Sequence, residues 1–240
     1  PGLYNVTLKV TDSGNKLSQV KIWLRIKALN IALLDTLDSD KGGVSDAEEG
    51  AGDSDGDGVA DYLDNAEQPA NVLALSDGKS LQVASGHVLQ LGQNAFGGES
   101  GTATTSMNDI ASYGGLASGI TALDEGFLAE SAIFDVGITG LSSPGDLASI
   151  IIALGNPLPA DAVYRKFMPS LGWVNLTAGN GYNIESVKSV NGACPNVAST
   201  TYTNGSTQDD DRLRLTSVVG VEFHGDGLSL LFWQIPVCVS

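Results

Sequence analysis

The sequence reads Asp53-Ser54-Asp55-Gly56-Asp57-Gly58-Val59-Ala60-Asp61-Tyr62-Leu63-Asp64 at the centre of its most acidic segment. Carboxylates stand at positions 1, 3, 5, 9 and 12 of this twelve-residue stretch, and glycine stands at position 6. That spacing wraps hard oxygen ligands around one Ca²⁺ ion, as in an EF-hand loop, and the glycine permits the sharp central turn. The stretch therefore predicts a calcium-binding loop with a structural role. Its expected ligands are the carboxylates of Asp53, Asp55, Asp57, Asp61 and Asp64 and the backbone carbonyl of Val59 at position 7.

A weaker copy of the pattern occurs fifteen residues earlier, as Asp38-Ser39-Asp40-Lys41-Gly42-Gly43-Val44-Ser45-Asp46-Ala47-Glu48-Glu49. Gly42 occupies position 5, so this copy has one side-chain ligand fewer and we expect it to bind Ca²⁺ more weakly. Short helical turns are expected at residues 45–49 and 60–63. The expected ligands of the weaker copy are Asp38, Asp40, Asp46, Glu49 and the backbone carbonyl of Val44.

The charge of this segment also favours a bound cation. Residues 35–67 contain 12 carboxylates and one lysine. Without a cation, so many carboxylates would repel one another and keep the segment disordered. A solvated acidic linker is the alternative, but such a linker has no need to keep two glycines and two ligand sets in phase.

Composition indicates a globular protein that is rich in turns. The chain has 240 residues, 42% of them hydrophobic and 17% charged, with 30 glycines and a net charge of −16. Residues 1–27 carry five bases and one acid, whereas the rest is acidic. No cluster of Lys and Arg is present that would bind phosphates, so a nucleic-acid partner is not expected. The apolar run near residues 228–239 is too short and interrupted to span a bilayer.

Two cysteines occur, Cys194 and Cys238, without the close spacing of a zinc or redox site. We expect one disulfide between them, which would stabilise the fold by roughly 3–5 kcal/mol. Two buried free thiols are the alternative. A disulfide and high acidity both suit an extracellular, Ca²⁺-containing setting.

Residues 68–240 are expected to form an all-β domain, a β-sandwich or jelly roll. Pro and Gly punctuate this part about every 10–15 residues, and no amphipathic helix longer than about ten residues is evident. The expected strands are 71–75, 79–84, 87–91, 101–105, 131–139, 147–154, 162–168, 172–176, 183–190, 212–223 and 228–239.

Residues 1–27 alternate between apolar and polar side chains on both sides of a turn at 12–15, which predicts a β-hairpin. The string Pro1-Gly2-Leu3-Tyr4-Asn5-Val6-Thr7-Leu8-Lys9-Val10-Thr11-Asp12 resembles the last two strands of a PKD or related bacterial immunoglobulin-like domain. A lone hairpin is marginal in water. We therefore expect the missing strands to precede Pro1, or another molecule to complete the hairpin by strand addition.

Two further resemblances cover the remaining chain. The acidic segment, within residues 28–67, resembles the thrombospondin type 3 repeats that link domains of secreted bacterial proteins, which implies calcium at the residues named above. Residues 156–167, Asn-Pro-Leu-Pro-Ala-Asp-Ala-Val-Tyr-Arg-Lys-Phe, followed by Leu171-Gly172-Trp173, resemble the choice-of-anchor U domain of bacterial surface proteins. That resemblance implies an all-β fold at the cell surface and supplies no catalytic residues.

Candidate catalytic residues are few, and an enzyme is not expected. His87 lies in an apolar strand and is expected to pack there. His224 alternates with Glu222 and Asp226, which could hold a metal, but the adjacent Gly-Asp-Gly favours a solvent-facing turn. The run 209–211 of three aspartates is expected to be a solvated turn, with a calcium-capped loop as the alternative. No nucleophile elbow, zinc-protease helix or phosphate loop occurs.

The expected function is a calcium-stabilised structural or adhesive segment of a secreted bacterial cell-surface protein. Its expected partners are neighbouring domains of the same protein or copies of itself. A carbohydrate- or substrate-binding module of a secreted hydrolase is one alternative, because exposed tryptophans could stack on surface glycans; core packing of Trp23, Trp173 and Trp233 is the competing explanation. A subunit of a strand-donating extracellular filament is the second alternative.

Overall fold

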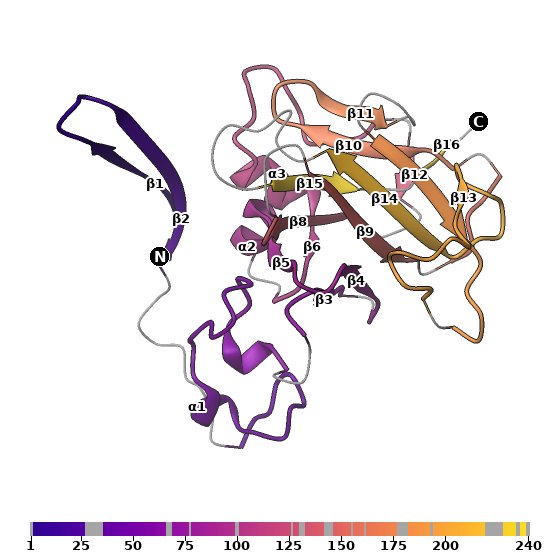
Figure 1. The fold of residues 1–240 in the computed structure, drawn as a ribbon, viewed down its shortest axis with the longest axis horizontal. Helices are drawn as coiled ribbons and strands as arrows, with labels where there is room; N and C mark the ends of the chain where they lie inside the picture. The colour runs from indigo at the N-terminus through magenta and orange to yellow at the C-terminus, as the bar shows by residue number, and fades with distance from the viewer. Residues whose placement is uncertain are drawn as a thin grey trace.

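The structure is a computed structural model, and it describes most of the chain. The described residues are 2–26, 36–65, 69–76, 78–98, 101–125, 127–129, 133–141, 146–154, 156–160, 162–176, 182–192, 194–218, 228–233 and 236–238. These residues form mostly antiparallel β-strands with a few short helices, which confirms the predicted all-β class (Figure 1). Among them, no helix has the length and apolar character needed to cross a membrane.

The N-terminal segment forms the expected hairpin. Strand β1 (Gly2–Thr11) pairs with β2 (Leu17–Ile26) in continuous antiparallel register from Gly2↔Ile26 to Thr11↔Leu17. The turn is closed by Asp12, whose Oδ1 accepts the backbone N–H groups of Gly14 at 2.8 Å and Lys16 at 2.9 Å. Such a local side-chain bond is the usual reason for aspartate at the start of a turn.

The acidic segment follows as two compact loops, which we call the acidic loop pair (residues 36–65). The first acidic loop is residues 38–49 and ends in helix α1 (Asp46–Glu49); the second is residues 53–64 and contains the 3₁₀ helix η1 (Asp61–Leu63). Both helical turns lie where the sequence predicts them. The remaining described residues, 69–238, are called the sheet region.

The sheet region contains a six-stranded antiparallel sheet in the order β13-β12-β14-β9-β4-β3. Its central pairs are long: β14 is in register with β9 from Arg212↔Ala153 to Val218↔Leu147. The strands are β3 (Val72–Ala74), β4 (Ser80–Val83), β9 (Leu147–Ala153), β12 (Tyr182–Val187), β13 (Thr203–Asn204) and β14 (Arg212–Val218).

A second sheet is built around β8 (Ile133–Thr139), which pairs with β5 (Val88–Leu91), β6 (Thr104–Thr105) and β15 (Leu228–Trp233). Two shorter pairs complete the strands. They join β10 (Tyr164–Met168) to β11 (Gly172–Leu176) and β7 (Phe127–Ala129) to β16 (Pro236–Cys238).

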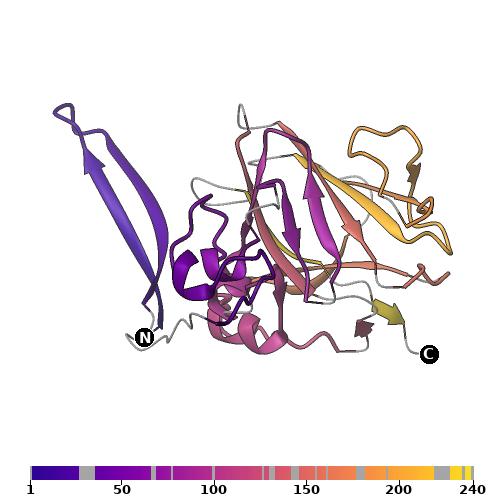
Figure 2. The same ribbon diagram turned by 90° about the horizontal axis from the view of Figure 1, so that it is seen from below.

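Both sheets bury side chains in one continuous apolar core. Figure 2 shows the strands of the sheet region from a second direction, with the β1–β2 hairpin standing apart from them. The six-stranded sheet contributes residues such as Leu81, Ile150 and Leu213, and β8 contributes Val136 and Ile138, all 2% exposed or less. A smaller cluster lies around Ile110 and Phe167, with Trp173 packed against it. Burial alternates along strands such as β4 and β12, which explains why apolar periodicity located them, whereas β8, β9 and β10 contain runs of buried residues.

Two helices and two short strands were not predicted. Helix α2 (Gln93–Gly98) and helix α3 (Met107–Tyr113) lie between β5 and β7, and β7 and β13 are only two or three residues long. Helix α3 begins with a capping box in which Ser106 and Asp109 bond each other's backbone. The sequence carries this signal with aspartate in place of the usual glutamate.

The predicted disulfide is not found in the structure. Cys194 is an exposed free thiol, and its Sγ lies 2.9 Å from Nε of Arg212. The same guanidinium donates from Nη2 to the carbonyl of Gly192 at 2.8 Å. The loop before Cys194 is thus fastened to β14 by Arg212. The side chain of Cys238 lies outside the described residues.

The second acidic loop packs a side chain into the core of the sheet region, and the first acidic loop does not. Val59, at position 7 of the second loop, is 4% exposed and lies in the main core cluster with Leu63 packed against it. Val44, at position 7 of the first loop, is 39% exposed. The repeat therefore presents the same side chain in two different environments.

Truncating these two valines should separate the roles of the two loops. We expect Val59→Ala to lower the free energy of unfolding of the sheet region by about 1–3 kcal/mol, because it leaves a cavity in the core. Val44→Ala is the matched control and should cost less than about 0.5 kcal/mol, because its side chain is already hydrated. Urea unfolding followed by tryptophan fluorescence measures both, and equal losses would contradict the assignment of Val59 to the core.

Candidate metal centre

The two acidic loops have the same backbone hydrogen bonds. Oδ2 of the aspartate at position 1 accepts the N–H of the glycine at position 6, at 3.1 Å for Asp38 and Gly43 and at 3.2 Å for Asp53 and Gly58. Both glycines have positive φ, +90° and +93°, a conformation that side chains disfavour. The repeat seen in the sequence is therefore a repeat of structure.

Position 9 has a role that the sequence analysis missed. Asp46 and Asp61 each accept two bonds from the serine at position 2, one from its N–H and one from its hydroxyl. The distances are 2.8 and 2.9 Å for Ser39 to Asp46, and 2.7 and 3.0 Å for Ser54 to Asp61. These carboxylates therefore close the loops, as expected where position 9 reaches a metal through water. Serine at position 2 of both copies was the available signal.

Three carboxylates of the second loop converge. One oxygen each from Asp53, Asp55 and Asp57 lie within 4.8 Å of one another, with Asp57 buried and the other two exposed. Positions 1, 3 and 5 are brought together because consecutive N–H groups bond back to them: Asp53 accepts Gly56, and Asp55 accepts Asp57. This is the part of the predicted ligand set that the fold gathers most tightly.

Asp57 is the most unusual acid of this cluster. It is 2% exposed, and its Oδ1 accepts the N–H of Val59 at 2.7 Å. Burial, reinforced by the charges of Asp55, Asp64 and Asp53, raises the pKa of Asp57 from 3.8 to about 7. A carboxylate in this position has lost water and lies near three other acids, so it gains from either a proton or a cation.

A second group of carboxylates lies between the loops. Burial, followed by the charges of Asp55 and Asp40, raises the pKa of Asp64 to about 6. The pKa of Glu49 is also raised, by desolvation first and then by Asp40 and Asp38. Oδ2 of Asp40 and Oε2 of Glu49 are shielded from solvent and have no hydrogen-bond partner. The carboxylate at position 3 of the first loop is thus close enough to the position-12 carboxylates of both loops to raise their pKa values.

The residues present fit a Ca²⁺ ion. They offer only oxygen, the donor that calcium prefers, and a loop of suitable length with glycine at its centre. Asp57, Asp64 and Glu49 have raised pKa values, and Oδ2 of Asp40 and Oε2 of Glu49 are shielded without hydrogen-bond partners. A cation near these carboxylates would neutralise their charge. Asp53, Asp55 and Asp57 would hold the ion at the centre of the second loop, and Asp64 and Asp40 would lie beside it. Val59 and Val44 would contribute through their backbone carbonyls.

The second loop is also bonded to strand β5. The carbonyl of Asp57 accepts the N–H of Leu91 at 2.7 Å, and the carbonyl of Gly56 accepts Nε2 of Gln90 at 2.7 Å. Gly58 lies so close to β5 that a Cβ there would contact Leu91. The loop is therefore held against the sheet region at positions 4 to 7.

Other charged residues have structural partners. Arg165 forms a buried ion pair with Asp124 and also donates to Oδ1 of Asn175 at 2.6 Å. In the aspartate run, Asp210 accepts Ser186 at 2.6 Å and Asp211 accepts Ser189 at 2.6 Å. Asp209 lies in an exposed turn as predicted, but Asp210 is 8% exposed and bonded to Ser186 rather than solvated. His87 is half-buried, and the set of Glu222, His224 and Asp226 lies outside the described residues.

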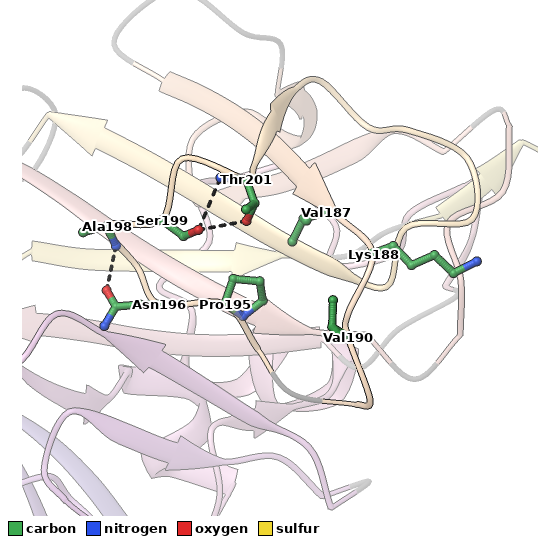
Figure 3. Close-up of a pocket in the computed structure, with 8 residues that line it drawn as sticks. All are labelled: Val187, Lys188, Val190, Pro195, Asn196, Ala198, Ser199 and Thr201. Atoms are coloured by element: carbon green, nitrogen blue, oxygen red, sulfur yellow. Dashed lines mark hydrogen bonds between the residues drawn. The ribbon is translucent and has the colours of Figure 1, made fainter.

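Trp173 is the tryptophan whose side chain the structure describes, and it packs against the smaller core cluster. Trp173 is half-buried, contacts Phe167 edge to face at 5.5 Å and donates from Nε1 to the carbonyl of Ala122. The side chains of Trp23 and Trp233 lie outside the described residues. A shallow hollow of about 490 Å³ lies between residues 187–190 and 195–201, and none of the side chains that line it is aromatic (Figure 3).

Comparisons with protein-family models, with curated proteins and with solved structures found no match to this chain. The resemblances to choice-of-anchor U domains, to thrombospondin type 3 repeats and to PKD domains therefore stay predictions. The fold and the acidic loop pair carry the functional argument.

Calcium binding should compete with protons. With its pKa near 7 rather than 3.8, Asp57 makes the folded, ion-free chain bind more protons than the unfolded chain between these values. The ion-free stability should therefore fall as pH rises through this window. Because Ca²⁺ must displace this proton, its apparent affinity for the second loop should fall by up to about tenfold per pH unit below about pH 7.

Calorimetric titration of chelated protein with Ca²⁺ at several pH values between about 5.5 and 8 measures this effect. Asp57→Asn, which cannot take up the proton, is the control and should bind weakly with a flatter pH profile. An affinity independent of pH in the unsubstituted chain would contradict the shifted pKa of Asp57.

Proposed function

We propose that this chain is a calcium-stabilised structural segment of a secreted bacterial surface protein. Ca²⁺ in the acidic loop pair fixes the direction in which the sheet region, proposed to be a β-sandwich, leaves the loops. The ion has a mechanical role, and no catalytic residue is assigned. The partners are neighbouring domains of the same protein or copies of this chain.

The single observation that carries the proposal is the position of Val59. In the ligand pattern, its carbonyl faces the ion, while its side chain is buried in the core of the sheet region. One residue thus links the metal loop to the β-structure. Together with the bond from Leu91 to the carbonyl of Asp57, this makes the order of the loop and the order of the core depend on each other.

The two loops contribute differently. The second loop has three converging carboxylates and is anchored to the sheet region. The first lacks a carboxylate at position 5, and its Val44 is exposed. Binding to the second loop stabilises the sheet region, whereas binding to the first loop orders that loop alone. Calcium therefore orders the acidic loop pair in two steps, first at the tighter second loop and then at the first loop.

Removing one position-1 ligand from each loop tests this division. Asp53→Asn should abolish most of the rise in melting temperature that Ca²⁺ gives the sheet region, because it removes a ligand from the anchored loop. Asp38→Asn, the equivalent change in the first loop, should leave that rise almost intact. Differential scanning calorimetry with and without chelator measures both.

Isothermal titration distinguishes the two sites directly. The unsubstituted chain should show two binding events, with the tighter one lost in Asp53→Asn and the weaker one lost in Asp38→Asn. A chain that binds no Ca²⁺ at millimolar concentration would refute the proposal. Equal loss of the melting-temperature rise in both variants would refute the separate roles of the loops.

A further inference from the structure

Position 4 has the same backbone shape in both acidic loops. Lys41 and Gly56 are the position-4 residues, and both have positive φ, +66° and +78°. In each loop the N–H of the next residue bonds back to the position-3 carboxylate, at 2.8 Å in the first loop and at 3.1 Å in the second. The local sequence therefore suffices to form this turn, even where a lysine adopts a conformation that favours glycine.

In the second loop, the turn is also held from outside. Nε2 of Gln90, on strand β5, donates to the carbonyl of Gly56 at 2.7 Å. The backbone of Gln90 is in turn fixed by antiparallel pairing with Gly137 of β8. In the first loop Lys41 is exposed, and its carbonyl accepts no equivalent bond from the described part of the chain. One side chain of the sheet region thus holds the backbone between the ligands at positions 3 and 5.

A neutral amide suits this place. Asp53, Asp55 and Asp57 have one oxygen each within 4.8 Å of one another, so without an ion they repel one another and favour opening of the loop. A hydrogen bond to the carbonyl of Gly56 resists that opening. Gln90 supplies the donor without a charge, whereas a lysine or arginine would add a positive charge that competes with a cation.

We propose that Gln90 is a positioning residue for the calcium site of the second loop, because it holds this loop in its binding-competent shape before the ion arrives. When a fraction of the chains has that shape, the apparent Kd equals the intrinsic Kd divided by the fraction, so a bond that raises the fraction tightens binding. The inference rests on the proposed function. It adds a second reason for tighter binding by the second loop, besides the carboxylate that the first loop lacks at position 5.

Gln90→Met tests the proposal, because it keeps the length of this half-buried side chain and removes its donor. Calorimetric titration of the chelated full chain with Ca²⁺ should show the tighter event weakened about 3- to 10-fold, which is the net effect of one hydrogen bond. The weaker event should stay unchanged. Gln82→Met makes the same change at a half-buried glutamine of β4 and is the matched control, which should alter either event by less than about twofold.

Gln90→Asn separates the reach of the side chain from its chemistry. It keeps the amide but is one methylene shorter, so it falls short of the Gly56 carbonyl while β5 stays paired with β8. It should weaken the tighter event as Gln90→Met does, while the melting temperature of the ion-free sheet region stays close to that of Gln82→Met.

The outcomes distinguish the positioning role from the proposed function. Undiminished affinity of the tighter event in Gln90→Met, or an equal loss of affinity in Gln82→Met, would overturn the positioning role and leave the proposed function standing. An unsubstituted chain that binds no Ca²⁺ would instead refute the proposed function itself.

Discussion

The contact between the second acidic loop and strand β5 is the constraint on which the arrangement of this chain depends. The carbonyls of Gly56 and Asp57 accept hydrogen bonds from β5, and the side chain of Val59 packs in the core. This places Asp57 where water cannot reach it, and burial is the largest cause of its raised pKa. The same packing that anchors the loop therefore creates the electrostatic problem that a cation would solve.

The first loop lacks this constraint, although its backbone is a close copy. Its glycines, its serine at position 2 and its position-9 aspartate make the same bonds as in the second loop. What differs is the outer environment, since Val44 remains exposed. Local sequence determines the shape of each loop, whereas contact with β5 and the core determines which loop is coupled to the sheets.

This distinction explains how much could be predicted. Periodicity located the hairpin, both helical turns and most strands, because each is specified by residues that are close in sequence. The packing of Val59 against the sheets and the bond from Leu91 are long-range contacts, and no local pattern announces them. The serine at position 2 is repeated in the sequence, but the ligand pattern assigns no role to that position, so its two bonds to position 9 were not predicted. The bridge between Cys194 and Cys238 was inferred from the number and spacing of the cysteines, and the structure instead places Arg212 against Cys194.

The two ends of the described chain differ in whether their apolar faces are covered. In the sheet region, apolar alternation is satisfied internally, because two sheets share a core. In the hairpin, the same alternation has no second layer among the described residues, so the pattern that predicts a strand also predicts an unsatisfied face. Between these two ends lies the acidic loop pair, and the proposed calcium ion would couple the order of its second loop to the core of the sheet region through Val59.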